Sequence, residues 1–407
     1  MHIPHSLPFT YFFTFLIITT PLTTPNHIQS HSAFLAGIDN PSPSSSHKSI
    51  SIPFEITDFH QIIITVCLGT PRNCYPFKLA TNMNECYILH KDLIHFGYDD
   101  KASSTFQSHH DSMWFEVQHQ MLHGEIVSDT LTIPSTPIEL DRFVFYLIKQ
   151  EDGLQTVRTR DYVGVLGLGK KYEDYAMSFM SQLYLTDHID DQMFSLTYKP
   201  STSNGYLTIG YHDYINTSSS SSSSKILPTQ LGNTNHNYRV VPIEETLSPS
   251  FEVKMNAIIY NNDLLDNSTR VFSNTQTVLF SPGANHIYCP TKFYTLLVNV
   301  VFNDVINKGN ALCWSERSGD YERIKCKNDI LTETVTLGDI RFIFTKWNVK
   351  IALTELFDEC GGDDYEYMCF AIVNIISSEQ WVMGYHFLKK YPIIFDADDY
   401  KIALKIK

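Results

Sequence analysis

The sequence lacks a surplus of positive charge. Its 407 residues include 30 Lys and Arg against 44 Asp and Glu, which gives a formal net charge of -14. Nucleic acids and anionic membranes attract basic surfaces, so neither is expected as a partner. Charged residues make up only 18% of the chain and hydrophobic residues 43%, which excludes disorder for most of it. The length suffices for two domains with full cores.

The sequence also lacks an apolar run long enough for a comfortable membrane span. The N-terminal run at residues 9–18 is too short for that and lies where a signal peptide is expected. We therefore predict a signal peptide over residues 1–24 and a secreted protein, extracellular or in the lumen of the secretory pathway. An uncleaved N-terminal anchor is the alternative. Residues 25–55 begin with a stretch rich in Ser and Pro and are expected to form a flexible leader.

No Cys-x-x-Cys pair occurs, and the 17 histidines are scattered, so the sequence predicts no metal site and no cofactor. Eight cysteines behind a secretory leader indicate disulfides, although eight allow 105 complete pairings. Cys67 and Cys74 flank a turn and are placed to face each other across a hairpin. Cys86 and Cys289 are either two buried free thiols or a bridge between the two halves of the chain.

Most of the remaining pattern is typical of β-strands. Apolar and polar residues alternate at residues 114–118, 126–133 and 341–344, which predicts strands, whereas residues 175–185 and 293–306 show helical spacing. A serine-rich insertion over residues 216–230 is expected at the surface. Asn216 and Asn267 begin N-glycosylation sequons, which matter only if the chain enters the secretory pathway.

Several longer motifs follow one another in a characteristic order. They are IIITVCLGTP at 62–71, LATNM at 79–83, DYVGVLGLG at 161–169, FSLTY with GYLTIG at 194–210, TVLFSPGA at 277–284, and WVMGYHFL with YPIIFD at 381–396. In this order they resemble segments of the pepsin-like (family A1) aspartic peptidases. The resemblance implies an all-β, two-lobed fold with a central cleft. The lobes would span residues 56–215 and 231–407, and the protein is expected to be a monomer.

The resemblance places the family's two catalytic aspartates at Ala80 and Ser281. Neither Asp-Thr-Gly nor Asp-Ser-Gly occurs anywhere in the chain, so a different register does not restore the pair. An aspartic peptidase needs two carboxyl groups that share one proton, and these two side chains supply neither function. We therefore predict no catalytic residue for this chemistry.

The same resemblance assigns the surroundings of the dyad. Asn82 and Met83 follow Ala80, and Gly283 and Ala284 follow Ser281; Met83 and Ala284 replace the hydroxyls that support the carboxylates in the family. His119 takes the place of the tyrosine in the flap, the hairpin that closes over substrate. The flap tip is also about two residues short by the family pattern, which indicates a compact hairpin turn.

Two disulfides are implied only by the resemblance. The segment from Cys326 to Cys360 matches the large disulfide loop of the second lobe in the family. Cys313 and Cys369 flank this loop, so a nested second bridge is implied between them, as in plant-type relatives.

Three functions remain open. We favour a secreted, non-catalytic homologue that binds peptide or protein through its cleft or its surface. The second is an aspartic-type endopeptidase, by family membership, with atypical or residual activity. The third is an interaction glycoprotein whose cleft is irrelevant. A nucleophilic mechanism at Ser281 is disfavoured, because Pro282 follows it directly and no nucleophile elbow, orienting carboxylate or oxyanion hole is recognisable.

Overall fold

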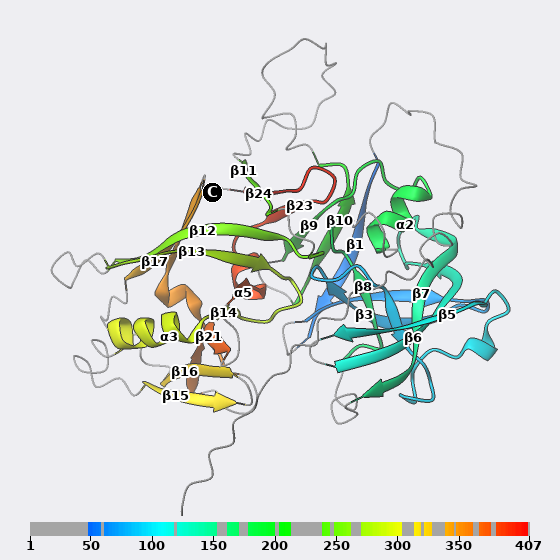
Figure 1. Cartoon of the computed structure of the whole chain (residues 1–407), viewed down its shortest axis with the longest axis horizontal. Helices are drawn as coiled ribbons and strands as arrows, with labels where there is room; N and C mark the ends of the chain where they lie inside the picture. The colour runs from blue at the N-terminus through cyan, green and yellow to red at the C-terminus, as the bar shows by residue number, and fades with distance from the viewer. Residues whose placement is uncertain are drawn as a thin grey trace, which may run out of the picture. The chain divides into compact units, whose positions relative to one another are not determined.

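The computed structural model describes residues 48–57, 61–117, 120–152, 161–170, 178–199, 203–212, 238–244, 248–261, 270–302, 313–318, 321–327, 338–345, 347–360, 366–375 and 380–405. Most of these residues lie in two mixed β-sheets (Figure 1). The predicted all-β, two-lobed fold is confirmed, with one sheet dominated by the first half of the chain and the other built by the second half.

The first sheet has 13 strands in the described part of the chain. In spatial order they are β11 (Tyr238–Pro242), β24 (Lys401–Lys405), β23 (Ile393–Asp396), β9 (Met193–Tyr198), β10 (Asn204–Gly210), β1 (Ser49–Ile56), β2 (Ile62–Leu68), β3 (Asn73–Ala80), β8 (Gly164–Gly167), β4 (Tyr87–Leu89), β7 (Glu139–Asp152), β6 (Gln120–Thr132) and β5 (Gln107–Val117).

The second sheet has 11 described strands. In spatial order they are β18 (Asn348–Ala352), β17 (Asp339–Phe344), β12 (Glu252–Asn261), β13 (Arg270–Phe280), β22 (Trp381–Met383), β14 (Ile287–Cys289), β21 (Ile372–Ile375), β16 (Tyr321–Lys327), β20 (Tyr367–Phe370) and β19 (Phe357–Glu359), while β15 (Cys313–Ser318) pairs with β16.

Helices are short and few among the described residues. They are η1 (Asp100–Ala102), α2 (Phe179–Leu185), α3 (Thr291–Leu297), η4 (Val298–Phe302), η6 (Leu353–Leu356) and α5 (Tyr385–Leu388). α2 and α3 lie within the two stretches for which helical spacing was predicted. α2 is capped by the Ser178 side chain, and the buried Gln182 amide bonds both the N–H and the carbonyl of Val144 on β7. None of the helices in this described part has the length and apolar content needed to cross a bilayer.

The predicted leader ends too late in the sequence. β1 begins at Ser49 and pairs antiparallel with β10 over seven residues, from Ser49↔Gly210 to Glu55↔Asn204. Its apolar residues occur at every second position, and the strand buries that face while the other stays exposed. This period of two favours a half-buried strand, so residues 49–55 belong to the first sheet. The serine-rich composition just upstream hid the alternation.

The predicted boundary between the lobes does not separate the sheets cleanly. β11, β23 and β24 come from residues beyond 231, yet they complete the first sheet beside β9. Phe194 of β9 stacks on Phe395 of β23 with ring centroids 4.6 Å apart, and Phe251 meets Phe395 edge-on at 5.0 Å. All three rings are buried. Each buried aromatic side chain contributes a few kcal/mol of hydrophobic stabilisation, so both halves of the chain share this part of the core.

The predicted bridge between Cys67 and Cys74 is confirmed. These two residues face each other in the antiparallel register of β2 and β3. This bridge joins the two strands that lead into the first of the two dyad positions.

The two bridges implied for the second half are wrong. Cys313 pairs with Cys326, and Cys360 pairs with Cys369, in place of Cys326 with Cys360 and Cys313 with Cys369. The reason is strand register: Cys313 lies directly opposite Cys326 on β15 and β16. Cys360 follows the end of β19, which pairs with the strand that carries Cys369. Disulfides are typical of oxidising compartments, which agrees with a secretory-pathway or extracellular protein.

Cys86 and Cys289 are free and buried, so the reading as two buried thiols is confirmed and the bridge between the halves is excluded. Burial raises the pKa of Cys86 to about 12 and raises the pKa of Cys289 well above its usual value. Because the thiolate is the reactive species, we expect neither thiol to react with a disulfide reagent in the native protein at pH 8. Unfolding should release both.

Titration with Ellman's reagent before and after addition of guanidinium chloride measures this expectation. The native chain should show no fast-reacting thiol and the denatured chain two. A thiol that reacts quickly in the native protein would contradict the burial described above.

Several predicted segments lie outside the described residues. These are the signal peptide at 1–24, the leader up to residue 47, the whole serine-rich insertion at 216–230, both sequon asparagines, Asn216 and Asn267, and His119 of the predicted flap. The flap strands themselves are β5 and β6, whose last register pair is Val117↔Gln120. Residues 118 and 119 connect them.

Candidate binding cleft

Two strand ends with the same local topology position the site. β3 runs parallel to β8 and ends at Ala80, opposite Gly167; β13 runs parallel to β22 and ends at Phe280, opposite Met383. In each case the chain then makes a short loop and returns antiparallel along the same central strand, as β4 beside β8 and β14 beside β22. The two loops, at residues 81–86 and 281–286, therefore leave from equivalent places.

A buried hydrogen bond joins these two strand ends. The Thr81 hydroxyl donates to the carbonyl oxygen of Phe280 over 3.2 Å, and neither residue is exposed to solvent. The Ser281 amide donates to the Met383 carbonyl, and the Ala284 amide donates to the Ser281 carbonyl. The two dyad positions therefore lie on a hydrogen-bonded floor contributed by both halves of the chain.

Above this floor lies a pocket of about 450 Å³, which we call the cleft pocket. Both predicted dyad positions, Ala80 and Ser281, line it, together with residues from the two loops and from the adjacent strands. The full lining is Gln61, Lys78, Ala80, Asn82, Met83, Tyr87, Tyr162, Val165, Leu279, Ser281, Gly283, Ala284, Asn285, Tyr288 and Val382. The structure thus brings together every predicted cleft residue that it describes.

The described lining residues of the cleft pocket include no aspartate, glutamate or histidine. No histidine stands among the described lining residues to pair with Ser281 as a nucleophile pairs with its base. His286 stacks in parallel on His386 with ring centroids 5.5 Å apart and is not one of the lining residues.

Aromatic side chains wall the pocket without filling it. Tyr87 and Tyr162 are buried, and Tyr288 donates its hydroxyl to Asn285 Oδ1. Burial, with a contribution from Tyr321, raises the pKa of Tyr288 above its usual value, so its hydroxyl stays protonated. Met83 and Tyr288 border the open volume, which leaves room for part of a peptide.

Lys78 is one of the lining residues that the sequence prediction missed. It lies two positions before Ala80 on β3, and alternate residues of a strand point to the same face, so both side chains reach the cleft pocket. Lys78 is only 6% exposed. A charged residue inside the otherwise apolar end of a buried strand is the signal in the sequence that points to it.

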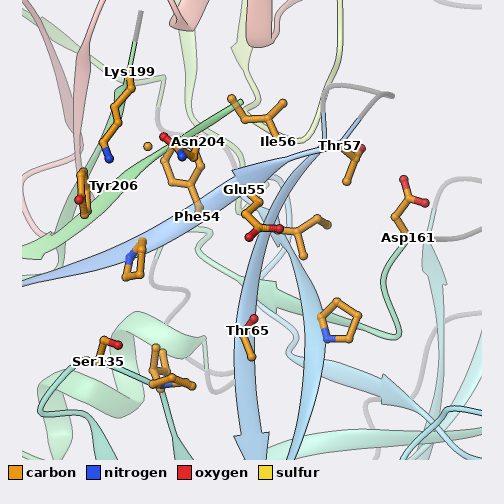
Figure 2. Close-up of a pocket in the computed structure, with 16 residues that line it drawn as sticks. Phe54, Glu55, Ile56, Thr57, Thr65, Ser135, Asp161, Lys199, Asn204 and Tyr206 are labelled. Carbon is orange, nitrogen blue, oxygen red and sulfur yellow. The ribbon is translucent and has the colours of Figure 1, made fainter. Parts of the chain in front are cut away.

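A second pocket of about 420 Å³ lies elsewhere on the first half of the chain and shares no residue with the cleft pocket. Figure 2 shows Lys199 and Tyr206 on one side of it and Asp161 on the other, with Glu55 between them. The Lys199 Nζ lies 4.9 Å from the centre of the Tyr206 ring. No group of three or more His, Cys, Asp or Glu that could hold a metal ion occurs in the described ranges.

The family model of the eukaryotic aspartyl proteases matches residues 82–405. The chain belongs to this family. The pepsin-like resemblance seen in the sequence motifs is therefore confirmed for the larger part of the chain. Within this aspartyl protease family member, the matched range includes Ser281 and starts two residues after Ala80. No curated protein matches the chain.

Proposed function

We propose that this protein is a secreted, non-catalytic member of the aspartyl protease family that binds peptide or protein through the cleft pocket. The observation that carries the proposal is the composition of that pocket. Ala80 and Ser281 lie at its equivalent strand ends, and no carboxylate is found among the described lining residues.

Peptide hydrolysis in this family requires one carboxylate to take a proton from water and one carboxyl group to donate a proton to the scissile carbonyl oxygen. The alanine methyl group at position 80 does neither. The serine hydroxyl at position 281 is not a base at neutral or acid pH. Met83 and Ala284, at the positions of the supporting hydroxyls, carry no hydroxyl, so the loss extends beyond the two carboxyl groups.

Retention of the cleft favours binding over an interaction surface elsewhere. The buried bond from Thr81 to Phe280 holds the floor in place, and about 450 Å³ stays open above it. Concave sites of this size, with apolar walls and a few polar groups, are typical of ligand pockets. Secretion belongs to the same proposal, supported by the N-terminal apolar run, three disulfides and two sequons.

Cleavage assays test the loss of activity. The purified protein is incubated with a peptide library and with denatured casein from pH 2 to pH 8, and products are followed by mass spectrometry. We expect no turnover at any pH, because the acid and the base of the mechanism are both missing. A pH-dependent turnover that Ser281→Ala abolishes would overturn this part of the proposal.

A pocket-filling variant tests whether binding uses the cleft. Asn82 is exposed and lines the cleft pocket, so Asn82→Trp should obstruct it and weaken binding to an immobilised random peptide library by about ten-fold or more, equivalent to about 1.4 kcal/mol. The matched control is Asn73→Trp, at the exposed start of β3, the strand that precedes Asn82, which should bind as the unmodified protein does. Equal binding by both variants would favour an interaction glycoprotein whose cleft is irrelevant.

A further inference from the structure

The cleft pocket contains a basic side chain where a catalytic aspartyl protease has two carboxyl groups. Among the described lining residues, Lys78 is the only one that carries an amine, guanidinium, imidazole or carboxyl group. Where an active member holds two carboxyl groups that carry negative charge, this chain offers an ammonium group. An electrostatic field of opposite sign selects a different class of ligand.

The Lys78 side chain reaches toward the loop of the second dyad position. A Cβ atom placed on Gly283 would lie 3.2 Å from Lys78 Cε and 3.8 Å from its Nζ. The Nζ also lies 5.5 Å from the centre of the Tyr162 ring, within the range of a cation–π contact. The ammonium group is therefore held beside the dyad positions, between the two halves of the chain.

Neutral hydrogen-bond donors surround this charge. The Ser281 hydroxyl and the side-chain amides of Asn82 and Gln61 line the same pocket, and each can donate to an anionic oxygen. Tyr87 and Tyr162 supply flat apolar walls. One cation, several neutral donors and aromatic walls match a carboxylate on a short aliphatic stem.

We propose that the cleft recognises a carboxylate of its bound peptide through Lys78, so that the protein selects acidic peptides. This inference rests on the proposed function, because it names the ligand class of the same cleft. A charge-assisted hydrogen bond in a half-enclosed pocket is stronger than a neutral one. A phosphate group, with up to two negative charges, is better served by arginine forks or several cations than by a single lysine.

The net charge of -14 repels acidic ligands at long range. The proposal therefore predicts how the preference for acidic peptides depends on salt concentration. Salt screens exposed charges over about 8–10 Å at 0.10–0.15 M, while a buried contact is screened much less. The preference for an acidic peptide should therefore persist, or increase, as the salt concentration rises. A preference that came from scattered surface lysines would fall instead.

The experiment measures binding of the full-length protein to four libraries of fluorescent seven-residue peptides by polarisation. Three have blocked termini and a fixed central Glu, Gln or phosphoserine; the fourth has a central Gln and a free C-terminal carboxylate. We expect the Glu library to bind about ten-fold or more tightly than the blocked Gln library, the range of a charged hydrogen bond. The fourth library shows whether a terminal carboxylate serves as well as a side chain.

Lys78→Met should bind the Glu and Gln libraries equally, and Lys78→Arg should keep the preference. The matched control is Lys199→Met, which removes one positive charge at an exposed residue of the second pocket (Figure 2) and should leave the preference intact. Lys78→Met should fold, since methionine has a similar length and avoids burying a charge; circular dichroism and thermal unfolding check this.

The outcomes separate this inference from the proposed function. If no library binds, the proposed function fails. If the Glu and Gln libraries bind equally well, or if Lys78→Met keeps the preference, peptide binding stands and the role of Lys78 is overturned. Tightest binding of the phosphoserine library, lost in Lys78→Met, would replace the carboxylate with a phosphopeptide and overturn the stated ligand class.

Discussion

Restoring both carboxyl groups, by Ala80→Asp together with Ser281→Asp, is expected to leave the protein without significant peptidase activity. Concerted proton transfer contributes about 10²–10⁴-fold to such rates, and the double variant should not regain it. Turnover should stay below about one-hundredth of that of an active pepsin-like enzyme assayed in parallel.

The reason is the environment that the new carboxyl groups would enter. A working dyad shares one proton, because two carboxylates in contact resist full ionisation. Lys78 lies on the same face of β3 as position 80, with its Nζ near Gly283. Its ammonium group would lower the pKa of both carboxyl groups and strip the shared proton. Met83 and Ala284 would supply no hydroxyl to hold the carboxylates in place.

The measurement is peptide-library cleavage from pH 2 to pH 7, with thermal unfolding to confirm that each variant is folded. Ala80→Asn with Ser281→Asn is the size-matched control. Adding Lys78→Ile to the double aspartate variant should raise the pKa of the pair without restoring the flap or the hydroxyls. Efficient turnover by the double variant alone would show that only the two carboxyl groups had been lost.

Replacing Gly384 by alanine should be the most damaging single change close to the cleft. Gly384 connects β22 to α5, and a Cβ atom there would lie 2.2 Å from the His286 carbonyl oxygen and 2.4 Å from the Ala284 carbonyl oxygen. Both contacts are with backbone atoms, so the loop that follows Ser281 must move. Overpacking typically costs about 1–3 kcal/mol, and we expect the upper part of this range, together with loss of peptide binding.

Urea unfolding followed by tryptophan fluorescence measures this loss. Gly283→Ala, in the loop that follows Ser281, is the matched control, because its Cβ would approach the Leu79 carbonyl oxygen only to 3.2 Å and the change should cost about 1 kcal/mol or less. Equal stability of the two variants would show that the loop relaxes freely around residue 384.

Much of the architecture was predictable, because a series of motifs in a fixed order restricts the fold more than any one of them. The dyad positions that the resemblance implies stay a prediction, but the structure places them together: Ala80 ends β3, Ser281 follows the end of β13, and the buried bond from Thr81 to Phe280 joins the two strand ends. β1 was missed because its alternation of buried and exposed residues follows a serine-rich stretch that dominated the composition.

The disulfides of the second half and Lys78 show what a sequence alone leaves open. Spacing along the chain brings Cys326 and Cys360 together on a family pattern, but strand register decides which sulfur atoms are adjacent, and it pairs Cys326 with Cys313. Lys78 belongs to none of the sequence motifs that identify the cleft. Its place in the cleft pocket is seen only in the structure, where β3, β8 and the loop at Gly283 line the same volume.

The first sheet cannot be completed until late in translation. β9 receives its partner β23 from a segment that lies roughly 200 residues later in the chain, which takes about 10–40 s to translate at about 5–20 residues per second. Until then one edge of β9 has no partner strand from this chain, and such edges pair readily with other molecules. Translation speed and the folding helpers present during that interval should therefore govern the yield of native protein.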